Sequence, residues 1–265
     1  MAAPRRGSPL LAVALIATLT ACGGPQQPAS WDDVVGGMLG NGYGARAGGA
    51  FGLDRVRVVE AGPGDGALEV RFPRGSASQE VHREAAAPEG GAQFYALRRA
   101  GPVETATLRY RVRFPKGFEF VKGGKLPGLY GGTATAGGRT PSGKDGFSTR
   151  YMWRADGKAE VYAYLPGSVE VGTSLGRGSW TWPTGRWVET EQEVVLNTPG
   201  RADGRLTVRI DGQQVLQRED LLFRDVQEVR IDGLFFSTFF GGGDTSWATP
   251  KDQSVMFADF DVLTG

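Results

Sequence analysis

The sequence contains only one cysteine and one histidine, and this scarcity limits the chemistry that it can carry. Cys22 has no second cysteine to pair with, so no disulfide can form within the chain and stability must come from the core. The single histidine, His82, has no Asp or Ser partner in a recognisable motif, and we interpret it as structural or solvated. These two counts argue against a zinc site and against a Ser-His-Asp or Cys-His nucleophile.

The apolar run near the N-terminus is short. Leu10 to Thr18 cannot span a membrane as a stable helix, and it follows Arg5 and Arg6, which is typical of a secretion signal. The next residues, Leu19-Thr20-Ala21-Cys22, resemble a bacterial lipobox. That resemblance implies a bacterial lipoprotein with a signal peptide over 1–21, cleavage before Cys22 and a lipid on its sulfur. The alternative is an ordinary signal peptide with an incidental cysteine.

We therefore expect an exported protein, lipid-anchored to the outer face of the bacterial cell membrane or released from the cell. Residues 22–30 are rich in Gly, Pro and Gln and predict a flexible tether. The membrane is thus an expected partner through the anchor at Cys22, and a tethered monomer is the expected state.

An excess of positive charge is also lacking. The chain has 30 Lys and Arg against 29 Asp and Glu, and removal of the leader with its two arginines leaves 28 against 29. No bulk positive field exists to attract nucleic acid, so no nucleic-acid partner is expected. Any attraction for an anionic polymer must be local.

Helical periodicity is almost absent, apart from a short helix predicted over Trp31 to Met38. Short β-rich runs separated by Gly, Pro, Asp and Asn dominate instead, with turn signals at Asp156-Gly157 and Asp211-Gly212. This rhythm predicts one all-β domain over 31–265, a sandwich or jelly roll. The predicted strands include Leu68 to Phe72, Thr105 to Phe114, Gly146 to Arg154, Glu160 to Leu165, Trp187 to Leu196, Arg205 to Ile210, Leu234 to Phe240 and Phe257 to Val262.

Polar side chains gather on two of these strands and on a glycine-rich segment before them. Because residues i and i+2 of a strand point to the same face, Ser148 and Arg150 should share a face, and so should Tyr162 and Tyr164. Lys125 stands between glycines in 123–132, which we predict to be a corner. Together these groups suit a site that binds an acidic sugar and moves protons.

Each of these residues also has an ordinary structural explanation. Lys125 could be a solvated surface charge, and Arg150 could lie on the wet face of a strand. Tyrosines at i and i+2, such as Tyr162 and Tyr164, are common packing residues.

The segment 131–146 contains Gly, Thr, Ala, Ser and Pro with few large apolar groups, so it cannot build a core. It is either a mobile surface loop or a lid over a cleft, because loops on rigid scaffolds often carry function.

Several separate motifs follow one another along the second two thirds of the chain. They are Gly-Gly-Lys-Leu-Pro-Gly-Leu at 123–129, Asp-Gly-Phe-Ser-Thr-Arg at 145–150, Met-Trp-Arg at 152–154, Tyr-Ala-Tyr at 162–164, Leu-Asn-Thr-Pro-Gly at 196–200, Asp-Gly at 211–212, Phe-Phe-Ser-Thr-Phe-Phe-Gly-Gly at 235–242 and Phe-Ala-Asp-Phe at 257–260. Together they resemble polysaccharide lyase family 14, the alginate and glucuronan lyases, in order over roughly residues 90 to 262. The resemblance implies a β-jelly roll of two antiparallel sheets with a concave substrate groove.

The resemblance implies a polysaccharide lyase that cleaves a uronate polymer, alginate or glucuronan, by β-elimination without a cofactor. A non-catalytic module that binds acidic glycans is the alternative. The segment 131–146 and the N-terminal third match nothing we can name, which leaves substrate choice open. The residues that the resemblance implies or that we expect at the site are Lys125, Ser148, Arg150, Tyr162 and Tyr164 for catalysis, and Arg154, Lys144 and Trp153 for substrate binding.

Overall fold

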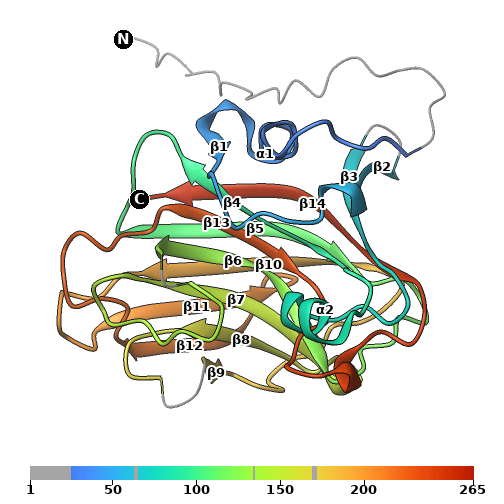
Figure 1. Cartoon of the computed structure of the whole chain (residues 1–265). Helices are drawn as coiled ribbons and strands as arrows, with labels where there is room; N and C mark the ends of the chain where they lie inside the picture. The colour runs from blue at the N-terminus through green and yellow to red at the C-terminus, as the bar shows by residue number, and fades with distance from the viewer. Residues whose placement is uncertain (1–24, 63–64, 134, 169–171) are drawn as a thin grey trace, which may run out of the picture.

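The chain folds as a sandwich of two antiparallel sheets with seven strands each, as seen in a computed structural model (Figure 1). The structure describes residues 25–62, 65–133, 135–168 and 172–265. The predicted signal peptide and Cys22 lie outside the described residues. The all-β jelly-roll prediction is confirmed.

The first sheet carries most of the residues predicted for the site. Its strands, in spatial order, are β1 (Tyr43–Ala45), β4 (Ala92–Arg98), β13 (Gly233–Thr238), β6 (Gly123–Gly132), β7 (Gly146–Arg154), β8 (Ala159–Tyr164) and β9 (Thr173–Leu175).

The second sheet packs against the first and supplies the other half of the core. Its strands, in spatial order, are β12 (Gln213–Leu221), β11 (Gly204–Ile210), β10 (Trp187–Val195), β5 (Thr105–Arg113), β14 (Gln253–Thr264), β3 (Asp65–Phe72) and β2 (Val56–Gly62).

Two helices and four short 3₁₀ turns complete the described part of the fold. Helix α1 (Trp31–Leu39) begins where Ser30 accepts a hydrogen bond from the Asp33 amide, and it packs beside β1 and β14 (Figure 1). Helix α2 (Gln79–Ala85) begins in the same way at Ser78. The turns are η1 (Gly40–Gly42), η2 (Leu53–Arg55), η3 (Ala155–Gly157) and η4 (Thr245–Trp247).

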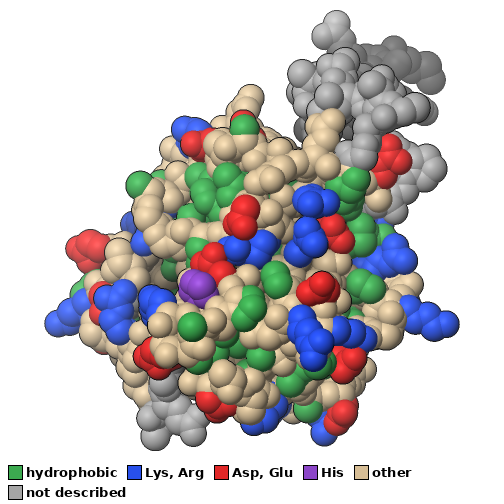
Figure 2. All heavy atoms as spheres, turned by 45° about the vertical axis from the view of Figure 1, so that its right-hand side comes forward, with side chains coloured by type: hydrophobic (Ala, Val, Ile, Leu, Met, Phe, Trp, Pro, Cys, Tyr) green, Lys and Arg blue, Asp and Glu red, His purple; other side chains and the backbone are tan. Residues whose placement is uncertain are grey.

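No helix in the described ranges is long and apolar enough to cross a membrane. Within the predicted tether, Gln26 exchanges two backbone hydrogen bonds with Val58, at 3.1 and 2.7 Å, so this part of the segment lies against the sandwich. Figure 2 shows acidic and basic side chains interspersed over one face of the molecule, in keeping with the balanced charge.

The alternation along β7 decides which side chains enter the core. Thr149 donates a hydrogen bond to Gln192 of β10, and Tyr151 donates one to the carbonyl of Glu191, so both face the second sheet. Trp153 follows them inward and packs edge-on against Phe72 and Phe114. Ser148, Arg150, Met152 and Arg154 therefore lie on the opposite side, which we call the outer face of the first sheet.

Sequence prediction located most of the strands. The predicted strand Gly146 to Arg154 matches β7 residue for residue, and the short helix corresponds to α1. The turn at Asp211-Gly212 joins β11 to β12, with φ values of 48° and 76° that suit a tight hairpin. The segment 123–132, however, is strand β6 rather than a corner, so that prediction was wrong.

Candidate active site

The predicted catalytic residues occupy neighbouring rows across β6, β7 and β8. In one row Arg150 pairs with Gly128 of β6 and Tyr162 of β8, and in the next Ser148 pairs with Tyr164. Lys125 pairs with Met152 one row further on. The structure thus brings all five predicted catalytic residues onto one face of one sheet.

A bulge in β6 brings Lys125 onto this face. Between Lys125 and Gly128 the register shifts, so that three steps along β6 match two steps along β7. Pro127 lies inside the bulge, where its missing N–H breaks no ladder hydrogen bond. In a regular strand residues 125 and 128 would point to opposite faces, so without the register shift Lys125 would lie on the face opposite to Arg150. Strand alternation alone could not reveal this placement.

Lys125 is half-buried and held among cations and an aromatic ring. Its Nζ donates to the sulfur of Met152 at 2.8 Å and lies 4.2 Å from the ring centre of Tyr162. Burial lowers the pKa of the Lys125 ammonium well below its usual range, and the nearby Arg150 and Arg154 lower it further, while Glu160 acts in the opposite direction. The neutral amine is therefore accessible at a lower pH than for a free lysine.

Arg150 is a buried guanidinium that forms no salt bridge with the described acidic residues. It is 1% exposed, and its Nη1 donates to Ser237 at 3.1 Å. Its Nε has no hydrogen-bond partner in the described structure. The guanidinium lies 4.6 Å from the ring centre of Phe235 and 5.3 Å from that of Tyr164. A buried cation with an unsatisfied donor is suited to receive an anion.

Gly128 permits the close pairing of β6 with Arg150. A Cβ at this position would lie 2.1 Å from the carbonyl oxygen of Thr149 and 2.6 Å from the Cα of Arg150. Any larger residue would therefore push β7 away from β6.

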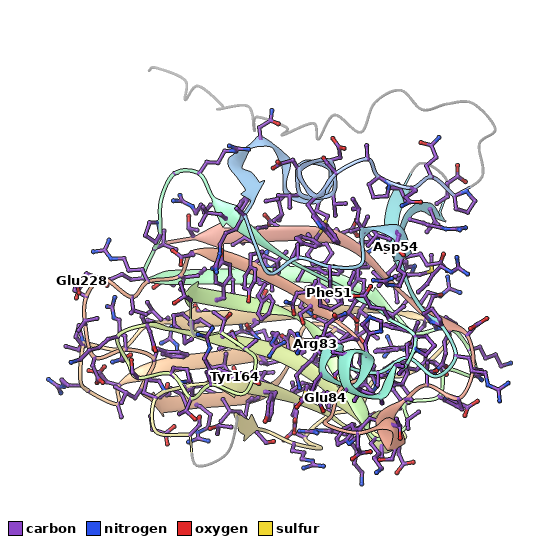
Figure 3. All side chains as sticks on the ribbon, in the orientation of Figure 1. Phe51, Asp54, Arg83, Glu84, Tyr164 and Glu228 are labelled. Carbon is purple, nitrogen blue, oxygen red and sulfur yellow. The ribbon has the colours of Figure 1, made fainter. Side chains whose placement is uncertain are left out.

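Tyr162 and Tyr164 meet edge to face, with ring centres 5.8 Å apart. Two cations lie near the ring of Tyr162: the Arg154 guanidinium is 5.6 Å from the ring centre, and the Lys125 ammonium is 4.2 Å from it. Tyr164, labelled in Figure 3, is 5% exposed and stands over Arg150. Both phenols are thus close to positive charge.

Ser148 contacts the segment 131–146 directly. Its Oγ donates to the backbone oxygen of Thr135 at 2.7 Å, and the hydroxyl of Thr135 shares a 2.7 Å hydrogen bond with Tyr95 of β4. Both Ser148 and Thr135 are buried. This end of the segment is therefore seated on the outer face, while Lys144, predicted to bind substrate, is exposed near its other end.

Two predicted substrate contacts have other neighbours in the structure. Arg154 pairs with the carboxylate of Glu160, and its Nε lies 2.8 Å from Oε1. Trp153 is fully buried between the sheets, where its indole N–H donates to the carbonyl of Phe120. The prediction for Trp153 was wrong, because its position in the β7 alternation directs it into the core.

Sequence reasoning missed three neighbours of the site. Met152 and Glu160 form the row of Lys125, and Ser237 of β13 holds Arg150. Alternation could have found the first two, because Met152 shares a face with Arg150 and Glu160 shares one with Tyr162. Ser237 comes from a distant part of the chain and left no comparable signal.

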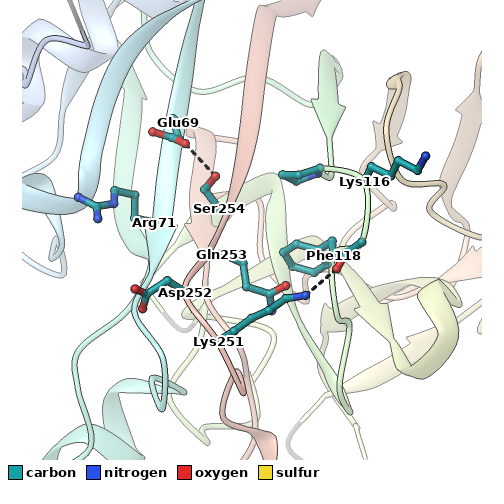
Figure 4. A pocket seen from close by; sticks show the side chains of 10 residues that line it. Glu69, Arg71, Lys116, Phe118, Lys251, Asp252, Gln253 and Ser254 are labelled. Atoms are coloured by element: carbon teal, nitrogen blue, oxygen red, sulfur yellow. Dashed lines mark hydrogen bonds between the residues drawn. The ribbon is translucent and has the colours of Figure 1, made fainter.

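Two other features lie apart from this site. His82 belongs to α2 and its Nδ1 is 2.6 Å from the carbonyl of Ala87, which fits a structural role. A shallow hollow on the second sheet is lined by residues of β3, β14 and the loop after β5 (Figure 4). Within its lining Glu69 accepts a hydrogen bond from Ser254 at 2.8 Å, and Lys251 forms an ion pair with the neighbouring Glu119 at 2.8 Å.

Comparisons with known proteins agree with this geometry. The family model described as Polysaccharide lyase 14 matches residues 61–260. The marine PL-14 alginate lyase from Aplysia kurodai is similar in structure, with 31% sequence identity and a TM-score of 0.76 over 91% of this chain and 97% of that one. No curated protein matches the chain in sequence.

Two more distant structures share the fold. Alginate lyase vAL-1 from a Chlorella virus has 23% identity and a TM-score of 0.72, over 85% of this chain and 94% of that one. The endo-β-1,4-glucuronan lyase from the fungus Trichoderma reesei has 14% identity and a TM-score of 0.56, over 85% and 92%. With the family match over most of the sandwich and the 31% identity to a family member, the chain belongs to polysaccharide lyase family 14 and is a polysaccharide lyase.

Proposed function

We propose that this lyase cleaves alginate by β-elimination on the outer face of the first sheet. One observation carries the proposal: the buried Arg150 pairs with Tyr162 on the neighbouring strand, and the Lys125 ammonium lies over the ring of the same tyrosine. The similarity to the alginate lyase from Aplysia kurodai favours alginate as the uronate polymer. Glucuronan is the competing substrate, and the experiment below includes it.

β-Elimination begins with neutralisation of the uronate carboxylate, because the C5 proton of a free uronate is too weakly acidic. Arg150 is the residue that we assign to this carboxylate. Its guanidinium can donate two parallel hydrogen bonds to a carboxylate, and its Nε is unoccupied in the described structure. The charge of the carboxylate would in turn offset the cost of burying the guanidinium.

A base then removes the C5 proton, and the electron pair of that C–H bond forms the C4–C5 double bond. The C4–O glycosidic bond breaks, and its oxygen takes a proton from an acid. Lys125 and one of the two tyrosines, Tyr162 or Tyr164, share these two roles. The lowered pKa of Lys125 makes its neutral amine available as a base nearer to neutral pH.

Ser148 positions either the sugar or the segment 131–146, which lies next to the site. Its hydroxyl donates to Thr135, so substrate that reaches Ser148 would have to displace this hydrogen bond. Lys144 and Arg154 add positive charge for a polyanionic chain. No metal or organic cofactor takes part in this scheme.

We further propose that the protein is exported and anchored through lipid on Cys22, as its lipobox-like leader suggests. Expression of the full chain and of a Cys22→Ser variant in a bacterium tests this. The intact chain should sediment with membranes and the variant should not. Equal release of both would support an ordinary signal peptide instead.

The substrate is tested with the domain from Trp31 onward on poly-mannuronate, poly-guluronate and glucuronan in separate reactions. β-Elimination creates an unsaturated uronate that absorbs in the ultraviolet, so absorbance over time reports the reaction directly. A rise on either alginate polymer supports the proposal, and a rise on glucuronan alone overturns the substrate assignment. Retardation of a polymer in a gel without any absorbing product would indicate a binding module.

A further inference from the structure

Glu160 is a fully buried carboxylate that the proposed reaction does not use. It lies on β8, two residues before Tyr162, and its side chain is on the outer face in the row of Met152 and Lys125. Its side chain has no exposed surface. Burying a charge is costly unless partners compensate it, so the contacts of Glu160 explain why it is tolerated.

Two arginines surround this carboxylate. Oε1 accepts hydrogen bonds from Nε and Nη2 of Arg154, the first at 2.8 Å. Oε2 lies 3.8 Å from Nε of Arg177, an exposed residue, and accepts no hydrogen bond in the described structure. Within the described structure, Arg154 thus binds one oxygen of the carboxylate, and the other oxygen accepts no hydrogen bond.

The position of Arg154 links Glu160 to the reacting groups. The Arg154 guanidinium lies 5.6 Å from the ring centre of Tyr162, on which the Lys125 ammonium also rests. Among the described residues, Glu160 accepts all the hydrogen bonds that the Arg154 side chain donates, so it is the polar group that holds Arg154 in this place. The ion pair of Glu160 and Arg154 also joins β8 to β7 across the hairpin that contains η3, so a purely structural role is the alternative to be tested.

We propose that Glu160 is a positioning residue of the lyase: its carboxylate fixes Arg154 over Tyr162 and sets the net charge that Lys125 faces. This inference rests on the proposed function. The charged groups around Lys125 come from two neighbouring strands, with Arg150 and Arg154 on β7 and Glu160 on β8. The arginines favour the neutral amine, while Glu160 favours the ammonium and so limits how far the pKa of Lys125 falls.

Glu160→Gln tests the proposal, since the amide keeps the size and the acceptor for Arg154 but removes the charge. We expect the limb of the kcat/KM–pH profile that belongs to Lys125 to move by about one unit toward lower pH. The direction is the same whether Lys125 acts as base or as acid, because removal of a negative charge favours the neutral amine in both cases. Arg154→Gln should move the same limb toward higher pH.

The matched control is Glu191→Gln on β10. Glu191 is also a largely buried carboxylate between two arginines, Arg109 at 2.7 Å and Arg209 at 2.6 Å, but it belongs to the second sheet. The pH profile of this variant should match that of the wild type, whatever its effect on stability. An identical profile for the wild type and Glu160→Gln, with only stability reduced, would leave Glu160 with a structural role and overturn the proposal.

A direct titration separates this inference from the proposed function. The ¹³Cε signals of lysine, labelled selectively, report each lysine against pH, and the signal missing from Lys125→Arg identifies Lys125. Glu160→Gln should lower the midpoint of that signal even if no polymer is cleaved. If Glu160→Gln does not fold, two other variants replace it. The proposal then requires that Arg154→Gln raise the titration midpoint of Lys125 and that Glu160→Asp leave this midpoint unchanged. Any other result for these two variants contradicts the proposal.

Discussion

Replacement of Arg150 by methionine should make the protein more stable and nearly inactive at the same time. Its guanidinium is 1% exposed, donates to Ser237 and has a free Nε, and none of the described acidic groups forms a salt bridge with it. A well-packed apolar side chain in place of a buried charge can raise stability by about 1–4 kcal/mol. We therefore expect a higher melting temperature for Arg150→Met.

The loss of activity follows from the contacts that Arg150 would make with the substrate carboxylate. Each hydrogen bond to a charged group contributes about 1.5–3 kcal/mol, so two of them correspond to about 10²- to 10⁴-fold in kcat/KM. Arg150→Lys keeps the charge but loses the two-pronged geometry, and it should recover only part of this loss. Product absorbance and thermal unfolding on the same preparations measure both effects.

Arg224 provides the contrasting control. It is 2% exposed, but it donates to the carbonyls of Asn197 and Val229 at 3.0 Å each, lies 3.3 Å from the carboxylate of Glu104 and belongs to the connection between β12 and β13. Arg224→Met should therefore lower the melting temperature and leave kcat/KM unchanged. Full activity of Arg150→Met, or a loss of stability like that of Arg224→Met, would refute the assignment of Arg150 as the carboxylate partner.

Four further substitutions test other parts of the account. Tyr162→Phe and Tyr164→Phe should each keep the fold by circular dichroism, and at least one should lower kcat by about 10²-fold, because the phenol of the acid or base is lost; full activity in both would contradict the roles given to them. Trp153→Ala should cost about 3–5 kcal/mol in denaturant unfolding, since it empties a site in the core between the sheets, and a normal stability would place Trp153 outside the core. Lys125→Met should raise stability by about 1 kcal/mol at neutral pH. Because the pKa of Lys125 is lower in the folded than in the unfolded chain, this gain should be full below the folded pKa and shrink as pH rises toward the ordinary lysine range; a gain independent of pH in thermal unfolding would argue against a buried ammonium.

Local alternation was enough to predict much of the fold and part of the site. The period of two along β7 and β8 placed Ser148 with Arg150 and Tyr162 with Tyr164, because alternation is a property of the strand itself. Asp211 and Gly212 indicated the hairpin, because aspartate and glycine tolerate the positive φ values that a tight turn requires. Such features need no knowledge of the rest of the chain.

The remaining features depend on contacts between distant segments. The bulge at Pro127 is stabilised by hydrogen bonds with distant segments: Tyr110 of β5 donates to the carbonyl of Pro127, and the Lys125 amide donates to the carbonyl of Phe239, just after β13. Helix α2 was not predicted, because only Val81 of its seven residues is buried and no apolar period is visible. The contact between Ser148 and Thr135 joins β7 to the segment that precedes it, and neither residue type signals it in the sequence.

The central claim is that Lys125 takes part in β-elimination on a uronate polymer. The most direct test follows the ultraviolet absorbance of poly-mannuronate, poly-guluronate and glucuronan with the wild-type domain and with Lys125→Ala, both verified as folded. We predict a rise on alginate polymer for the wild type that disappears in Lys125→Ala. An equal rise with Lys125→Ala, or no rise with the folded wild type on any of the three polymers, would contradict the account.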